Sequence, residues 1–272
     1  MCVPGCLQHV QARLDRRAFL GAGAAAASVA TMPVRPAVSA EPRSFTRVVD
    51  LTHTTSPEFP TFFGVPGISF QDKFTYAKDK FNLKVWTLDE HTGTHIDSPF
   101  HFSADGWTVD QIPAASLVCP LCVIDIAERA AGNPDAQLTP DDVRAYEAAH
   151  GPIPAGACIA MHSGWDRHVT GPKFRNADDQ GVMHFPGFHP ETVAMLMTDD
   201  RQVAGIAVDT LSLDHGMSKD FAVHYAWLPT NRWGIECIAG LAELPAAGAT
   251  LIVGAPKVRG ATSGPTRVYA LA

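Results

Sequence analysis

Four long apolar segments, each bounded by turn residues, constrain the fold of this chain most strongly. They read "LVCPLCVIDI", "ACIAMHSGW", "QVAGIAVDTLSLD" and "TLIVGAPKV". Strands that are covered on both faces carry continuous apolar runs, whereas half-exposed strands alternate apolar and polar residues. We therefore expect these segments to be interior strands of a sheet with packed layers on both of its faces.

Helix signals stand between these segments. "TPDDVRAYEAAH" offers Thr139 as an N-cap, Pro140 at the first helical position and acidic residues in the first turn, and "HPETVAMLMTDD" has the same pattern. "RVVDLTHTTSPEFP" predicts a short strand entering a proline-rich loop, and "FNLKVWTLDEH" predicts another strand. With 272 residues, 46% of them hydrophobic, the chain can bury one substantial core. The expected fold class is α/β: a single domain with a mixed sheet and short outer helices.

The first 40 residues have the composition of a targeting signal. A basic segment ending in "DRRAFL" precedes the bland apolar "GAGAAAASVATM" and then "AVSA", which suits cleavage before Glu41. Arg16 and Arg17 make the segment resemble a twin-arginine signal. An amphipathic helix of the domain fits poorly, because residues 18–27 show no polar face, and the apolar stretch is too short to span a membrane. We expect residues 1–40 to be a signal peptide and residues 41–272 an exported domain, periplasmic or secreted, that is not inserted in the membrane.

Charge and cysteine content exclude several classes of function. Without residues 1–40, 17 basic and 27 acidic residues remain, a formal charge of −10, which makes nucleic acid an unfavourable partner. "CPLC", at Cys119 to Cys122, has the spacing of a redox or zinc motif. It lies inside an apolar run and has no second such pair, so we expect buried strand cysteines, whose oxidation state the sequence leaves open.

The segment "HTGTHIDSPFHF" concentrates metal-binding side chains. In an extended chain the odd-numbered positions share a face, so His91, His95 and Asp97 point the same way, and Gly93 leaves room between the imidazoles. Two imidazoles and a carboxylate are a normal ligand set for zinc or manganese and leave positions open for water. The alternative is a polar surface loop, and the spacing is not that of helical zinc proteases. The sequence favours a metal site with His101 beside it.

These residues resemble a known family. "HTGTHIDSPFHF" is similar to the HxGTHxDxPxHF motif of the metal-dependent cyclase family, which contains bacterial kynurenine formamidases and isatin hydrolases. "DLTHTTSPEFP", "HSGWD", "FPGFHPETVAML", "GIAVDTLSLD" and "HYAWLPTNRWGIECIAGL" follow the family's order, so the resemblance covers residues 47–255 or so. It implies the cyclase-like, swivelling β/β/α form of the α/β fold.

The resemblance also assigns roles to residues. It implies one or two divalent ions, zinc or manganese, with ligands His91, His95, Asp97, His224 and Glu236. His101 would be the proton donor and acceptor, and Phe59 would line the substrate pocket. Glu236 lies in the apolar segment "WGIECIAGL", where a metal would offset the cost of burying its carboxylate.

The implied activity is hydrolysis of an amide-type C–N bond in a small aromatic substrate, as in arylformamidases. The sequence "FPTFFG" departs from the Pro-Gly-Asp turn of formamidases. This departure and export both shift some weight to the second-ranked alternative, isatin hydrolase-like opening of a cyclic amide or lactone. An exported metal-binding protein without catalysis would not need His101. No Gly-x-Ser-x-Gly motif indicates a serine hydrolase. By resemblance we also expect a homo-oligomer, a dimer or larger.

Overall fold

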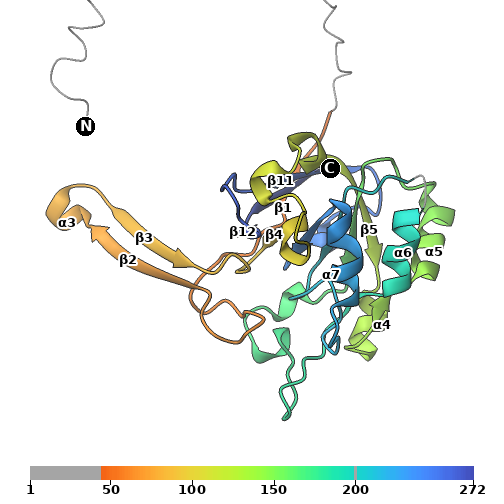
Figure 1. Cartoon of the computed structure of the whole chain (residues 1–272), viewed down its shortest axis with the longest axis horizontal. Coiled ribbons are helices and arrows are strands. Elements are labelled where there is room, and N and C mark those ends of the chain that lie inside the picture. Colours follow the sequence, from red (N-terminus) through yellow and green to blue (C-terminus); the bar gives the residue numbers. More distant parts are fainter. Residues whose placement is uncertain (1–43, 199–200) are drawn as a thin grey trace, which may run out of the picture. The chain divides into compact units, whose positions relative to one another are not determined.

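The apolar segments form neighbouring strands of one mixed sheet in the computed structural model, which describes residues 44–198 and 201–272 (Figure 1). The signal peptide predicted for residues 1–40 lies outside the described residues. The strands of this sheet are β1 (Val48–Asp50), β4 (His95–Asp97), β5 (Val118–Asp125), β7 (Cys158–His162), β9 (Gly205–Val208), β10 (Trp233–Glu236), β11 (Ala249–Gly254), β12 (Ser263–Pro265) and β13 (Arg267–Leu271).

The order across the sheet is β1-β13-β11-β5-β7-β9-β10-β4-β12. The central strands β5, β7, β9 and β10 are parallel to one another, and the outer pairs on both sides are antiparallel. This arrangement confirms the predicted mixed sheet with buried interior strands. It also places β4, which carries two of the predicted metal ligands, directly beside β10, which carries a third.

Short helices cover one face of the sheet. They are α4 (Ala127–Gly132), α5 (Pro140–His150), α6 (Pro190–Thr198) and α7 (Ala222–Trp227) (Figure 1). Helix α5 begins where the sequence predicts, because the Asp142 carboxylate accepts hydrogen bonds from the backbone N–H (2.7 Å) and the hydroxyl (2.8 Å) of Thr139. The connections contain 3₁₀ turns: η2 (Pro99–Phe102), η3 (Val109–Gln111), η4 (Ala114–Leu117), η5 (Asp166–His168), η6 (Pro172–Phe174), η7 (Leu228–Thr230) and η8 (Leu241–Glu243).

The sheet separates two hydrophobic clusters. On the helix-covered face, Met161 and Val208 pack with Val143 of α5 and Leu196 of α6. The opposite face curls around a second cluster, whose members come from strands across the whole sheet: Val49, Ile96, Leu121, Ala160, Ala207, Ile235, Leu251 and Val268. Both faces of the central strands are therefore buried, which explains their continuous apolar sequence.

The cysteines of "CPLC" are structural. Cys119 and Cys122 are free and buried, and they belong to different clusters on the two faces of β5. An offset of three residues in a strand points side chains to opposite faces, so the two thiols do not form one site. The expectation of buried strand cysteines is confirmed.

One part of the fold lies outside this layered body. β2 (Ile68–Phe74) and β3 (Leu83–Leu88) form a separate antiparallel hairpin, with helix α3 (Tyr76–Asp79) at its tip, that projects away from the sheet (Figure 1). The sequence predicts the strand β3 but not its partner β2. We call residues 68–88 the arm. A further short parallel pair, β6 (Gln137–Leu138) and β8 (Gly187–Phe188), lies near the helices. None of the helices in the described residues is long and apolar enough to cross a membrane.

Candidate metal centre

Antiparallel pairing of β4 with β10 brings the first charged groups together. His95 lies directly opposite Glu236 in the register, and its Nε2 is 3.3 Å from Oε2 of that carboxylate. Asp97 is two residues further along β4, so its side chain leaves the strand on the same side as His95. The Oδ1 atom of Asp97 lies 3.4 Å from Nε2 of His95. Strand geometry alone therefore assembles two carboxylates around one imidazole.

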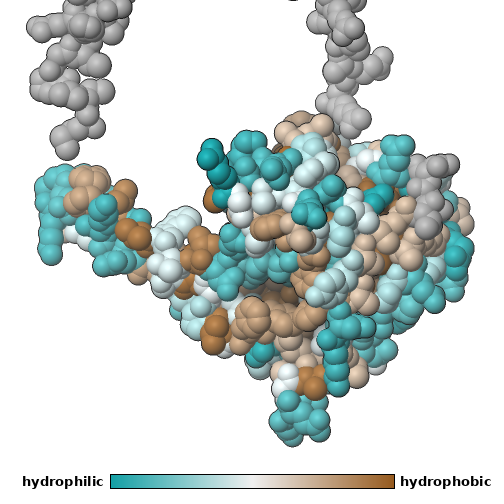
Figure 2. Space-filling view, viewed as in Figure 1, coloured by the Kyte–Doolittle hydropathy of each residue, from teal (hydrophilic) through white to brown (hydrophobic). Residues whose placement is uncertain are grey.

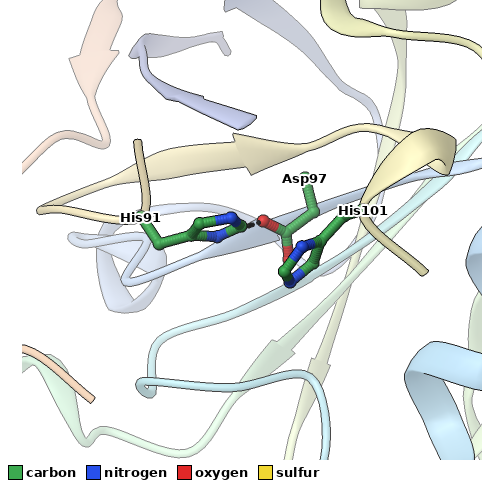
Figure 3. A group of neighbouring side chains, drawn as sticks. All are labelled: His91, Asp97 and His101. Carbon is green, nitrogen blue, oxygen red and sulfur yellow. Dashed lines mark ion pairs between the residues drawn. The ribbon is translucent and has the colours of Figure 1, made fainter. Parts of the chain in front are cut away.

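The side chain of His91 also lies at this cluster, but the backbone that carries it is a turn and not the extended strand expected from the sequence. Only residues 95–97 are in a strand, and the chain before them turns at Gly93, where φ is +72°. A Cβ at Gly93 would lie 2.4 Å from Oγ1 of Thr55, so the glycine permits close packing with Thr55 and does not separate the imidazoles. The turn still delivers Nδ1 of His91 to within 3.0 Å of Oδ1 of Asp97 (Figure 3).

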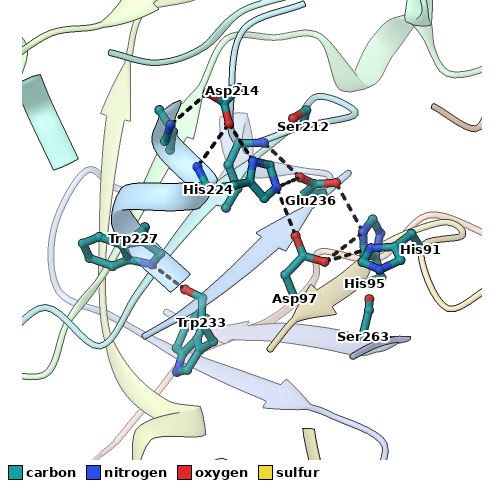
Figure 4. Close-up of polar contacts among 12 residues, drawn as sticks. His91, His95, Asp97, Ser212, Asp214, His224, Trp227, Trp233, Glu236 and Ser263 are labelled. Carbon is teal, nitrogen blue, oxygen red and sulfur yellow. Dashed lines mark hydrogen bonds and ion pairs between the residues drawn. The ribbon is translucent and has the colours of Figure 1, made fainter. Parts of the chain in front are cut away.

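Helix α7 supplies His224 from the opposite side. Its Nε2 lies 3.2 Å from Oε1 of Glu236 and 3.6 Å from Oδ2 of Asp97. Its Nδ1 donates a hydrogen bond of 2.6 Å to Asp214, which also accepts the backbone N–H groups of Val223 and His224 at the start of the helix (Figure 4). Asp214 therefore fixes both the end of the helix and the orientation of the imidazole.

The five predicted ligands therefore converge, His224 through its contacts with Asp97 and Glu236 and the other four as members of two overlapping groups, one of which also includes His101. Two sets of side chains have ligand atoms close enough together for one ion: His91, Asp97 and His101, and His95, Asp97 and Glu236. Asp97 belongs to both sets. A carboxylate with two oxygens can serve two ions, so the geometry accommodates one ion or two.

The chemistry of these donors fits a divalent cation. Nε2 of His95 and both carboxylate oxygens of Asp97 are buried without a hydrogen-bond partner among the described residues. Unpaired buried polar groups are costly, and a cation at the point where they converge would satisfy them. Nδ1 of His95 contacts the carbonyl of Gly93 at 2.8 Å, which leaves Nε2 free as a ligand atom.

The electrostatics of the cluster favour positive charge. Burial alone would lower the pKa of His95, but the Asp97 and Glu236 carboxylates raise that pKa to about 10. Burial would likewise raise the pKa of Asp97, but the imidazoles of His224, His91 and His95 hold it well below its usual range. The site therefore keeps its carboxylates ionised and attracts cations.

His101 lies at the edge of the cluster, and its pKa is lowered, whereas the pKa values of His95 and His224 are raised. Its ring centroid is 4.1 Å from that of His91 and 5.9 Å from that of His224. Burial, together with the neighbouring imidazoles, lowers the pKa of His101 to about 4, although the Asp97 carboxylate opposes this. A neutral imidazole in this position can accept a proton at neutral pH.

A cavity of about 330 Å³ opens onto the cluster. The four polar groups at its base are His91, His101, His224 and Glu236, and Ser212 lies beside them. Its remaining lining is apolar: Phe62, Phe63, Phe102, Leu211 and Phe221. Figure 2 shows a hollow flanked by apolar surface on the visible face of the molecule. Among the described residues, no lysine or arginine lines this cavity, so it suits a small uncharged aromatic molecule better than an anion.

Comparison with known proteins agrees with this geometry. The Cyclase family model matches residues 49–215. The chain belongs to the Cyclase family. It is 35% identical to an isatin hydrolase of Roseibium aggregatum over 82% of this chain and 91% of the relative. It is 24% identical to a kynurenine formamidase of Salinibacter ruber over 81% of this chain and 95% of the relative. The solved isatin hydrolase A from Ralstonia solanacearum superposes with a TM-score of 0.77, at 35% identity, and the match covers 83% of this chain and 91% of that structure.

Membership of the Cyclase family confirms the predicted fold, but one predicted site residue lies elsewhere. Phe59 is buried in a cluster with Trp165 and Phe174, and it is absent from the cavity lining. The aromatic wall comes instead from the next turn of the same loop, at Phe62 and Phe63. The role of Phe59 in substrate binding stays a prediction. In the structure Phe59 belongs to the buried cluster against which Phe62 of the cavity wall packs.

Sequence reasoning missed two residues of this Cyclase-family site. Asp214 is the last residue of the segment "GIAVDTLSLD", and the sequence does not distinguish it from the other carboxylates as a site residue. Its position directly after a buried apolar run is the one signal that could have indicated it. Phe221 has a left-handed backbone, with φ of 50°, just before α7, and its ring contacts those of Phe62 and Phe102 in the cavity lining. No sequence pattern marks a strained phenylalanine.

Proposed function

We propose that this chain is a metal-dependent hydrolase that uses water to cleave an amide-type C–N bond in a small aromatic substrate. The observation that supports this most strongly is the convergence of buried ligand atoms, several without a hydrogen-bond partner among the described residues, at the base of an aromatic cavity. Both named relatives are hydrolases by name, an isatin hydrolase and a kynurenine formamidase. A binding protein without catalysis would not need a neutral histidine beside the ligands.

The proposed ligands are His91, His95, Asp97, His224 and Glu236. These residues would hold a divalent ion, which would supply Lewis-acid polarisation of a carbonyl group and would lower the pKa of a water molecule toward about 7. His101, neutral because of its burial, accepts the proton of the attacking water at an imidazole nitrogen and returns it to the departing nitrogen of the substrate. The oxygen of the water first adds to the carbonyl carbon of the substrate, and the C–N bond then breaks as the departing nitrogen takes the proton. Because water is the nucleophile, no covalent enzyme intermediate is required.

The aromatic wall orients the substrate. The rings of Phe62 and Phe221 contact each other at an angle of 47°, with centroids 6.0 Å apart, and the ring centroid of Phe102 lies 5.7 Å from that of Phe221. Rings at these positions hold a flat apolar molecule by edge-to-face and offset contacts. They also exclude bulk water from the polar base, which strengthens the electrostatic interactions there.

Between the two substrate types, we favour the cyclic amide. The sequence alone ranks arylformamide hydrolysis first, but the chain is 35% identical to an isatin hydrolase and 24% identical to a kynurenine formamidase over similar lengths. Parallel assays with isatin, a formanilide and a simple aromatic lactone separate the possibilities. Turnover of isatin at least tenfold above the others is expected, formanilide preference would restore the formamidase assignment, and inactivity on all three would contradict the proposal.

The metal and the cellular location complete the proposal. Zinc is the first candidate and manganese the second, since intrinsic affinity favours zinc but availability in the cell can decide. Residues 1–40 support export by a twin-arginine pathway, which carries folded proteins and would allow metal loading in the cytoplasm. Fractionation of cells that express the full chain tests this, because export predicts a shortened chain outside the cytoplasm. The homo-oligomer expected from the family resemblance is also part of the proposal.

A further inference from the structure

The loop that carries the aromatic wall of the cavity has little structure of its own. Residues 53–67, which precede the arm, contain no helix or strand. A single turn orders the part that carries Phe62 and Phe63: the Gly64 N–H donates to the Thr61 carbonyl at 3.1 Å, and the Thr61 hydroxyl donates to the Val65 carbonyl at 2.6 Å. Phe63 is 72% exposed. A loop held only by its own turn opens locally at little cost, so the position of the wall depends on contacts from outside the loop.

Arg175 makes such a contact with the backbone of the wall. Its Nη2 donates a hydrogen bond of 3.0 Å to the carbonyl of Phe62. The same guanidinium lies against Gly64, where a Cβ would be 2.7 Å from Nη1 and 2.9 Å from Cζ. In Figure 1 the loop, in orange, lies beside the green segment of residues 166–176. One side chain therefore contacts the residues on both sides of Phe63.

This contact is the main interaction of a guanidinium that lacks a counter-ion. Arg129, Arg201 and Arg267 each pair with a carboxylate. Among the described residues Arg175 forms no ion pair, and its Nε is buried without a hydrogen-bond partner. A partly buried cation without a carboxylate is costly, and an apolar side chain would fill the same space at a lower cost. The arginine is therefore explained better by its contact with the loop than by packing.

The backbone that carries Arg175 is firmly held. Phe174, directly before it, is fully buried, and its carbonyl accepts a hydrogen bond of 2.9 Å from Nε1 of Trp165. Asn176, directly after it, donates from its side chain to the carbonyl of His184 at 2.8 Å and accepts the His184 N–H at 3.2 Å. Arg175 thus connects a well-anchored segment to a weakly ordered loop.

We propose that Arg175 is a positioning residue of the cavity, which fixes the Phe62 carbonyl and thereby places the rings of Phe62 and Phe63. Arg175 is not among the residues that line the cavity, so it acts through the wall and not on the ligand. The inference rests on the proposed function only for the ligand class, an uncharged flat aromatic molecule. The proposed metal ligands and His101 lie on other segments, so loss of Arg175 should weaken binding and leave the chemical step nearly unchanged.

The test compares metal-loaded parent protein with Arg175→Met, which keeps the aliphatic stem, and Arg175→Lys, which keeps a charged donor. Arg144→Met is the matched control, because it removes the same charge from a side chain that is 60% exposed on α5. Two readouts need no turnover: hydrogen exchange in residues 59–66, and the Kd of indole, an uncharged bicyclic aromatic without an amide to cleave.

Arg175→Met should speed hydrogen exchange in residues 59–66 at least tenfold and weaken indole binding about tenfold, with metal content unchanged. Arg175→Lys should recover part of both effects, and Arg144→Met should match the parent protein. If isatin is turned over, its KM should rise about tenfold in Arg175→Met while kcat changes by less than about threefold.

Gly64→Ala gives an independent check through a double-mutant cycle. Its methyl group would displace the guanidinium, so the substitution should weaken indole binding in the parent protein and add less to Arg175→Met. Gly64 has φ of +70°, and the strain of alanine there is present in both backgrounds, so it cancels in the cycle. Strictly additive effects would overturn the proposal.

Other results would overturn it as well. One is parent-like hydrogen exchange and indole affinity in Arg175→Met. Another is loss of metal or faster exchange throughout the domain, which would make Arg175 a support of the whole fold. A fall in kcat at unchanged KM, or a parent protein that does not bind indole, would also contradict it. The expected changes in a protein that hydrolyses no amide would instead refute the proposed function and leave the role of Arg175 standing.

Discussion

Asp214 accepts a hydrogen bond of 2.6 Å from Nδ1 of His224, so that Nε2 of the same ring faces Asp97 and Glu236. The same carboxylate caps the helix that carries His224. Carboxylates that hold the distal nitrogen of a metal-binding histidine fix its tautomer and raise its basicity. Asp214 therefore positions a ligand without contacting the metal centre itself.

Asp214→Ala should weaken metal binding about 10- to 100-fold, because the His224 ring loses its orientation. Competition with a chelator of known affinity measures the change. Asp220→Ala is the control, since Asp220 is an exposed neighbour that accepts a hydrogen bond from Ser218 in the same loop. An Asp214 variant that binds metal as tightly as this control would show that the hydrogen bond is dispensable.

His101→Ala should reduce kcat by about a hundredfold or more while metal content stays nearly intact, because proton transfer is lost but no proposed ligand is. Turnover and metal content must be measured on the same preparation. His101 also belongs to one of the two candidate ligand groups, with His91 and Asp97. Loss of metal together with activity would make His101 a ligand, and the proton-transfer role would then be wrong.

Asp97→Ala should remove metal and activity together, because both candidate ligand groups share this carboxylate. Asp125→Ala provides a comparison at the end of β5, where the side chain is 66% exposed and lies outside the cluster. Metal content by elemental analysis and turnover are the readouts. If Asp97→Ala retained a full equivalent of metal, the ligand assignment would be refuted.

The ligands that lie in one short segment could be predicted from the sequence, whereas the residues that the fold brings to them from elsewhere could not. "HTGTHIDSPFHF" predicts His91, His95 and Asp97 as one group because a short local segment holds all three. His224 and Glu236 reach the site only through the pairing of β10 with β4 and the placement of α7, which are long-range facts. The family resemblance, and not periodicity, supplied those two residues.

The central strands were predictable because their signal is also local: a strand that is buried on both faces has a continuous apolar sequence. The arm shows the limit of this reasoning. β2 reads "ISFQDKF", a mixed pattern that does not distinguish an exposed strand from a loop. The extended geometry expected for residues 91–97 also failed, because Gly93 turns the chain where Thr55 packs against it.

His184 and its two carboxylate neighbours, which are not among the residues that line the cavity, give the protein a pH-dependent contribution to stability. Nδ1 of His184 lies 2.9 Å from Asp135, and its Nε2 lies 3.8 Å from Asp178, so a hydrogen bond and the charges of these carboxylates raise the pKa of His184. The protonated imidazole is favoured in the folded state. Its contribution is complete below the ordinary histidine pKa and disappears as pH rises through the raised value.

His184→Gln should therefore lower the Tm at pH 6 and have a smaller effect at pH 9. Thermal unfolding of parent and variant at both pH values gives this difference, and effects of other titrating groups cancel in it. The side chains of His184 and Asp135 are 25% and 27% exposed, so solvent screens their interaction and the change in Tm should be modest. An equal change in Tm at both pH values would mean that the histidine contributes packing and not charge.

The measurement that tests the central claim most directly is elemental analysis of residues 41–272, purified without added metal and quantified per chain. A metal centre built from His91, His95, Asp97, His224 and Glu236 predicts one or two equivalents of zinc or manganese. One equivalent would indicate a one-ion site, and two equivalents a two-ion site. Protein without metal that takes up neither ion on incubation would contradict the account.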